Sequence, residues 1–98
     1  NLPPFERFIS IIISSENERQ LNLESFKTKS FLDKKINAEI LGPVNAPIYR
    51  IRKKFRNRIL IRSKKNQNIQ KSLNFALKEL KLSKGIKLTV DVDPITFN

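Results

Sequence analysis

The side chains with the clearest chemistry are the Lys and Arg residues in the middle of the chain. Residues 40–78 hold eleven of the twenty basic residues and none of the nine acidic ones, whereas residues 1–39 and 79–98 each carry equal numbers of both signs. A protein surface usually mixes the two signs, because like charges repel one another. The net charge of +11 is therefore confined to one stretch, and it predicts a face that binds a polyanion.

Basic and apolar residues alternate within residues 48–62. A period of two is typical of extended chain, and the run is too long for one ordinary strand, so we predict a hairpin with its turn near Lys53 and Lys54. Cations on such a hairpin neutralise phosphates, while Phe55 either stacks on an unpaired base or packs in the core. Whether both arms share one basic face depends on loop length, since an even-numbered loop swaps the parity of inward positions. The predicted nucleic-acid-binding residues are Arg50, Arg52, Lys53, Lys54, Phe55, Arg56, Arg58, Arg62, Lys64 and Lys65.

Other chemistry is poorly represented in the sequence. Asp91 and Asp93 would share one face of a strand, but no third hard ligand has a telling spacing, so we expect an ion-pairing or turn role rather than a metal site. The absence of Cys and His excludes disulfides and the usual zinc ligands. Neither Gly lies in a phosphate-binding loop. We therefore predict no catalytic residue, metal or cofactor, and no enzyme activity for this chain by itself.

Length and composition limit the setting. The 98 residues suffice for one modest core, so we expect a single domain over residues 1–98. The longest uninterrupted apolar run, residues 11–13, is far too short to span a membrane. The first thirty residues show no signal-peptide pattern, which makes the cytoplasm the expected location. Because the sequence contains no Met, we expect a fragment of a longer protein.

The elements that must position the basic residues follow from the apolar spacing. Residues 5–15 predict a strand, and residues 17–35 predict a helix with Leu23, Phe26 and Phe31 facing inward. A short strand at 38–41 is expected to break at 42–47, where two prolines cannot donate ladder hydrogen bonds, so these residues form either a bend or an edge crossing.

The second half of the chain continues the pattern. The hairpin precedes a helix over about 66–82, capped by Ser63 or Asn66 and stopped by Gly85, and residues 87–93 predict a last strand. The resulting order, β-α-β-β-α-β, is that of a ferredoxin-like α+β fold, with a four-stranded, mostly antiparallel sheet and two helices on one face. The other face would be free for a partner. The predicted apolar stripe of the second helix is Ile69, Leu73, Ala76, Leu77 and Leu80.

Four short motifs, in register from end to end, resemble the C-terminal domain of the primosomal protein N′ (PriA) family of bacterial replication-restart helicases. Residues 3–5 (PPF) match an approach to the first strand, and residues 40–47 (ILGPVNAP) match an L-G-P-x-x-A-P bend. Residues 54–61 (KFRNRILI) match a basic-aromatic-basic strand, and residues 90–94 (VDVDP) match the D-V-D-P ending. Asn57 stands where the family often has an aromatic residue, and Lys53 where it often has Gly, which gives electrostatic contact more weight here.

The resemblance implies a structure-selective, sequence-independent DNA-binding accessory domain. Its parent would be a 3′ to 5′ ATP-dependent DNA helicase that assembles the primosome at stalled forks, with ATP, Mg²⁺ and zinc bound upstream of this chain. The implied partners are forked or single-stranded DNA, other primosome proteins and the acidic tail of single-stranded DNA-binding protein. For that tail, the family likeness directs attention to Lys64 and Lys65 at the start of the second helix.

Charge alone leaves two alternatives open. A ribosomal-type RNA-binding domain can have a similar fold and a similar basic face, and so can an interaction module that recognises an acidic peptide. Competition between forked DNA, single-stranded DNA and double-stranded RNA of equal length separates the first alternative from DNA binding.

Overall fold

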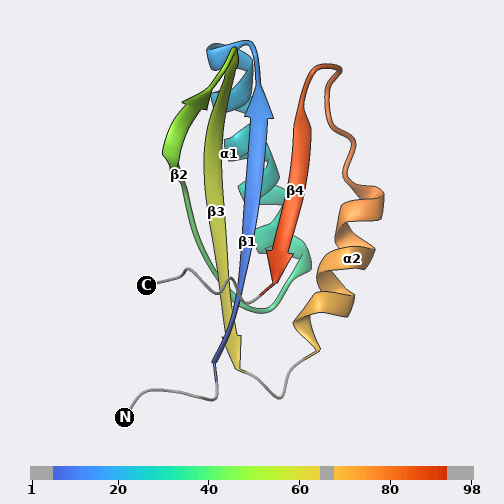
Figure 1. Ribbon diagram of the computed structural model, residues 1–98. Coiled ribbons are helices and arrows are strands. Elements are labelled where there is room, and N and C mark those ends of the chain that lie inside the picture. The colour runs from blue at the N-terminus through green and yellow to red at the C-terminus, as the bar shows by residue number, and fades with distance from the viewer. Residues whose placement is uncertain (1–5, 65–67, 93–98) are drawn as a thin grey trace.

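The four strands of the protein form one antiparallel sheet in the order β2-β3-β1-β4 (Figure 1). The computed structural model describes residues 6–64 and 68–92. Within them the arrangement confirms the predicted ferredoxin-like fold. The elements are β1 (Glu6–Ser15), α1 (Glu18–Lys35), β2 (Glu39–Ile51), β3 (Lys54–Lys64), α2 (Ile69–Glu79) and β4 (Lys87–Val92).

The sheet has one face that packs against the helices and one that does not. Side chains alternate along each strand, so the odd positions of β1 and β3 share one face and the even positions share the other. The odd positions Ile9, Ile11, Ile59 and Ile61 are almost completely buried and join Leu21 of α1 and Leu73 of α2 in the core. We call this the helix side. The opposite face, which carries Ile12, Arg56, Arg58 and Arg62 among others, is the open face.

Helix α1 has the predicted bounds but not the predicted inward residues. Asn17 caps it by accepting from the Gln20 amide at 2.9 Å. Leu23 and Phe26 were predicted to face inward, which is wrong: they are 65% and 63% exposed. Only Phe31 packs, partly buried, against the core.

The inner face of α1 is instead partly polar. The residues that it buries are Leu21, Glu24, Ser25, Thr28 and Leu32. Glu24 accepts a hydrogen bond from the Ser83 hydroxyl, in the segment between α2 and β4, and Ser25 accepts one from the Asn57 amide at 3.0 Å. Because hydrogen-bonded polar groups occupy this face, apolar spacing alone misplaced it.

Helix α2 confirms four of the five residues of the predicted stripe but is shorter than expected: it ends at Glu79, and Leu80 is its C-cap residue. Ile69, Leu73 and Ala76 are buried, and Leu77 packs partly against the core. Asn68, rather than Ser63 or Asn66, is the N-cap residue, and its side chain accepts from the Lys71 amide at 3.3 Å. Gly85, with φ of 90°, lies in the turn before β4 rather than at the end of the helix.

Strand β2 continues through the segment expected to break it. It forms an edge of the sheet, where a proline costs no ladder hydrogen bond. Its pairing with β3 shifts register twice, between Leu41 and Val44 and again between Asn45 and Arg50. Gly42 has φ of 106°, and a Cβ atom there would lie 2.8 Å from the Arg58 carbonyl oxygen. Glycine therefore allows β2 to approach β3 closely at this point.

No helix within the described residues is long and apolar enough to cross a membrane.

Candidate nucleic-acid interface

The basic residues of β3 lie on the open face of the sheet. Because β3 alternates, its even positions point away from the helix side, where Asn57, Ile59 and Ile61 are buried. The pairing with β1 places Arg56, Arg58 and Arg62 opposite Ser14, Ile12 and Phe8. The predicted residues that this strand brings to the open face are Lys54, Arg56, Arg58, Arg62 and Lys64.

Few carboxylates neutralise these cations. Arg62 has Glu39 of β2 at 3.8 Å, in a solvent-exposed pair of the kind that contributes little to stability. Arg56 donates to the Ile48 carbonyl at 2.9 Å, which fixes its guanidinium without cancelling its charge. The Nε atom of Arg58 is buried and makes no hydrogen bond within the described residues. The surplus charge of this strand is therefore available to an anionic partner.

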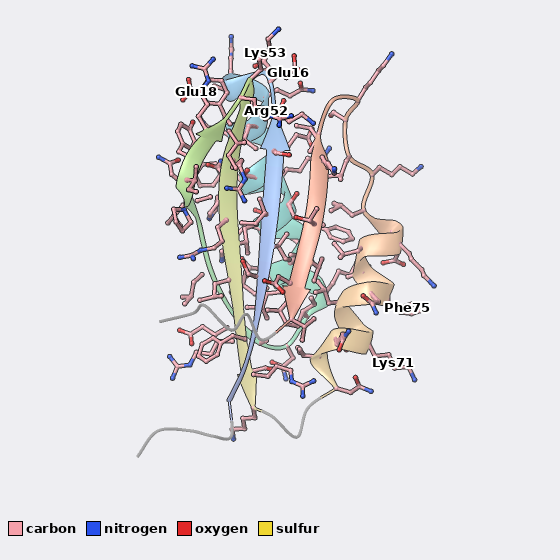
Figure 2. The ribbon with its side chains drawn as sticks, viewed as in Figure 1. Glu16, Glu18, Arg52, Lys53, Lys71 and Phe75 are labelled. Atoms are coloured by element: carbon pink, nitrogen blue, oxygen red, sulfur yellow. The ribbon has the colours of Figure 1, made fainter. Side chains whose placement is uncertain are left out.

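The turn between β2 and β3 has two residues, Arg52 and Lys53, one position before the predicted turn. Arg52 has φ of 58°, the left-handed conformation that such short turns require. Figure 2 shows both residues near the end of the hairpin. They add two more cations beside those of β3.

The even-numbered turn separates Arg50 and Phe55 from the other predicted residues. Arg50 pairs with Phe55, so both side chains lie on the helix side rather than on the open face. The Phe55 ring packs against the core and lies 5.5 Å from the Tyr49 ring, and the Arg50 guanidinium lies 5.0 Å from its centroid. Of the two uses predicted for Phe55, this placement agrees with core packing. The arms of the hairpin do not share one basic face.

Tyr49 connects the end of the hairpin to the start of α1. Its hydroxyl donates to the Glu18 carboxylate at 2.5 Å. This hydrogen bond, partial burial and the negative charge of Glu18 raise the pKa of Tyr49 above its ordinary value of 10.0. The contact holds the base of the turn against the helix layer.

A hollow of about 640 Å³ lies on the open face beside the turn. Its lining comes from the turn, from the adjacent strands β1, β3 and β4, from Ile51 at the end of β2 and from Glu16 just after β1. We call it the turn hollow. Its lining residues are Ile12, Ser14, Glu16, Ile51, Arg52, Lys53, Lys54, Arg56, Lys87 and Thr89.

Lys87 is the cation that the sequence prediction missed. It belongs to β4 and pairs with Ser14 of β1, which on its other side pairs with Arg56. Lys87 is separated from the basic strand β3 by the whole of α2, so only the sheet order brings it to the same face. The alternation of the last strand predicts that Lys87 and Thr89 share a face. It predicts which face of the sheet this is only when β4 is known to pair with β1.

Lys65 and Asp93 lie outside the described residues. Asp91 is exposed and pairs with Ser10, an even position of β1, so its carboxylate lies on the open face. Helix α2 carries two further exposed lysines, Lys71 and Lys78, and between them in the sequence Phe75, whose side chain is 73% exposed. Figure 2 shows Lys71 and Phe75 on this helix. A second, shallower hollow of about 370 Å³ follows this outer surface of α2.

The fold and the open face define an α+β sheet domain with a basic face that carries few acids. Among known proteins, the sequence model of the family described as "Primosomal protein N C-terminal domain" matches residues 1–95. The chain therefore belongs to this family, and it is the C-terminal domain of a replication-restart protein.

Similar proteins agree with this assignment. The chain is 36% identical over 97 residues to the replication restart protein PriA of Rickettsia felis, and 35% identical over 100 residues to that of Borreliella burgdorferi. These alignments cover 99% and 98% of the chain but only 15% of each relative, so the chain spans a small part of their length. In structure it resembles the de novo designed protein Foldit4, with a TM-score of 0.65 at 16% identity over 91% of this chain and 97% of that one. That likeness shows the fold alone.

Proposed function

We propose that the open face binds DNA without reading its sequence, as an accessory surface of a 3′ to 5′ ATP-dependent helicase that restarts replication at stalled forks. The observation that carries the proposal is the alignment of the β3 cations on one face with few carboxylates. Lys and Arg contact phosphates, which are the same for every sequence, and such contacts position a protein without specifying bases.

The wider assignment rests on the relatives, whose name is replication restart protein PriA. Under it, the parent's ATP, Mg²⁺ and zinc would be bound by the part of the relatives that this chain does not span, and the chain itself would be non-enzymatic and cytoplasmic. Forked and single-stranded DNA, other primosome proteins and the acidic tail of single-stranded DNA-binding protein are the proposed partners. Lys64, which lies at the end of β3, is the described residue proposed for the tail.

The test is the salt dependence of DNA binding by this chain. Removing one cation that touches a phosphate should flatten the slope of log K against log salt by about 0.7 to 0.9. The triple variant Lys54→Ala, Arg58→Ala, Lys64→Ala should therefore flatten the slope by about 2 to 3 units on a forked oligonucleotide.

The matched control removes the same charge from other surfaces. Lys27, Lys34 and Lys81 are exposed, and their triple Ala variant should keep a slope close to that of the parent chain. If both variants flatten the slope equally, net charge rather than the open face governs binding. Preference for double-stranded RNA over forked DNA of equal length would favour the RNA-binding alternative.

A further inference from the structure

The turn hollow combines two kinds of surface. Basic side chains form one part of its lining, contributed by the turn, β3 and β4. The side chains of Ile12 and Ile51 supply an apolar part, and Ile51 remains 43% exposed. A volume of about 640 Å³ falls within the range of about 300–1,000 Å³ that is usual for small-molecule sites. The cations of the lining are Arg52, Lys53, Lys54, Arg56 and Lys87.

The apolar part is unnecessary for binding phosphate. A phosphate needs cations and hydrogen-bond donors, and it gains nothing from aliphatic side chains. Two partly accessible isoleucines enclosed by five cations instead suit a ligand with a flat apolar portion next to its negative charges. A nucleotide has this character, because each base presents an apolar face attached to a sugar-phosphate.

The pairing state of the DNA decides whether that apolar face is accessible. In a duplex, the base faces are stacked inside the helix, so its phosphates can reach the cations of the hollow while its bases cannot reach Ile12 and Ile51. In a single strand the base is free to turn toward them. The hollow therefore distinguishes the two forms through its apolar part and not through its cations.

We propose that the turn hollow binds one unpaired nucleotide, with the base against Ile12 and Ile51 and the adjoining phosphates on the surrounding cations. This inference rests on the proposed DNA-binding function and specifies the form of DNA that the site prefers. Glu16 also lines the hollow. Its carboxylate repels an acidic peptide, but it accepts hydrogen bonds from the amino groups of bases.

The experiment compares two exposed residues on the same edge strand. Ile51 lines the turn hollow, whereas Val44, 53% exposed and paired with Arg58, lies on the open face outside it. Ile51→Ser should weaken binding of this chain to a single-stranded oligonucleotide on the order of fivefold, because it removes apolar contact area. Its affinity for a blunt duplex of the same length should stay within about twofold of the parent value. Val44→Ser should leave both affinities unchanged, and unfolding curves of both variants show whether the fold is intact.

The possible outcomes are distinct. If Ile51→Ser weakens single-strand and duplex binding equally, or if Val44→Ser has the same effect as Ile51→Ser, the inference is overturned while the proposed function stands. If an oligo-glutamate peptide binds and depends on Ile51 as strongly as the oligonucleotide does, the hollow is a peptide site and the inference is again overturned. If neither DNA form binds, both the inference and the proposed function are overturned.

Discussion

The two faces of β3 are built under different constraints, although they alternate along the same eleven residues. On the helix side, Ile59 and Ile61 are at most 1% exposed and belong to the hydrophobic core. Arg56, Arg58 and Arg62 alternate with these isoleucines and lie on the open face. No helix among the described residues covers that face. Packing determines the residues of the helix side, and electrostatics those of the open face. Substitutions at the odd positions of β3 should therefore change stability, and those at the even positions should change binding.

The largest effect is expected for Ile59→Ala. Its side chain is fully buried, so truncation removes apolar burial and leaves a cavity, which costs about 2–5 kcal/mol of unfolding free energy. Leu60→Ala, one residue further on the open face, should cost less because that side chain is only partly buried. Urea unfolding of the two variants provides the measurement. Equal losses at the two positions would remove the distinction between the faces.

The second effect concerns a polar residue on the helix side. Asn57 is 4% exposed, and its side-chain amide donates to Asn22 and Ser25 of α1, each at 3.0 Å. Asn57→Ala should lower the unfolding free energy by about 1–3 kcal/mol, because it leaves the buried Ser25 hydroxyl without this donor. Asn22→Ala removes only the exposed partner and should cost less. A larger loss for Asn22→Ala would show that the contact is not anchored in the interior.

A smaller effect, dependent on pH, is expected at the end of the hairpin. The raised pKa of Tyr49 means that folding favours the protonated hydroxyl, so the stabilisation is complete below about pH 10 and is lost as the pH rises through the folded-state pKa. Tyr49→Phe should cost about 1 kcal/mol at neutral pH. The difference in unfolding free energy between the parent chain and Tyr49→Phe should become smaller as the pH rises above about 10.

The composition simplifies this measurement. Tyr49 is the only Tyr, and the chain has no Trp, so the absorbance of tyrosinate reports its ionisation directly. Glu18→Gln should move that titration to lower pH. If the titration of the parent chain has its midpoint at or below 10.0, the assigned interaction with Glu18 is incorrect.

The smallest effect is expected on the outer face of α1. Leu23 and Phe26 are largely exposed, so Leu23→Gln and Phe26→Gln should each change the unfolding free energy by less than about 0.5 kcal/mol. Leu21→Ala on the same helix is the matched buried substitution, because Leu21 is fully buried. If either substitution lowers the unfolding free energy by more than about 2 kcal/mol, the side chain is buried, as the sequence predicted.

The sequence predicted the fold because its strands alternate clearly and α2 has a continuous apolar stripe. It failed on the inner face of α1, where Glu24, Ser25 and Thr28 are buried. The hydrogen bonds of Glu24 and Ser25 come from Ser83 and Asn57, far along the chain, and no local period reveals them. Apolar periodicity identifies a buried face only when that face is apolar.

The candidate site was predicted in part for a related reason. Alternation grouped the β3 cations correctly, because side-chain parity is a local property. It could not assign Arg50, whose face depends on the number of residues in the turn, or add Lys87, whose position depends on the order of strands. Phe55 has its ring against the core, and its predicted stacking on a base remains a prediction.

The length of the β2-β3 turn controls which residues of the hairpin lie on the open face. With two residues in the turn, Arg50 is directed to the helix side together with Phe55. Inserting a single residue there would move every side chain of one arm to the opposite face relative to the other arm. Arg50 would then lie on the open face, and its neighbours in β2 on the helix side. Relatives that differ by one residue at this point would therefore display different charge patterns from nearly the same strands, which makes insertions and deletions in this turn more consequential than substitutions.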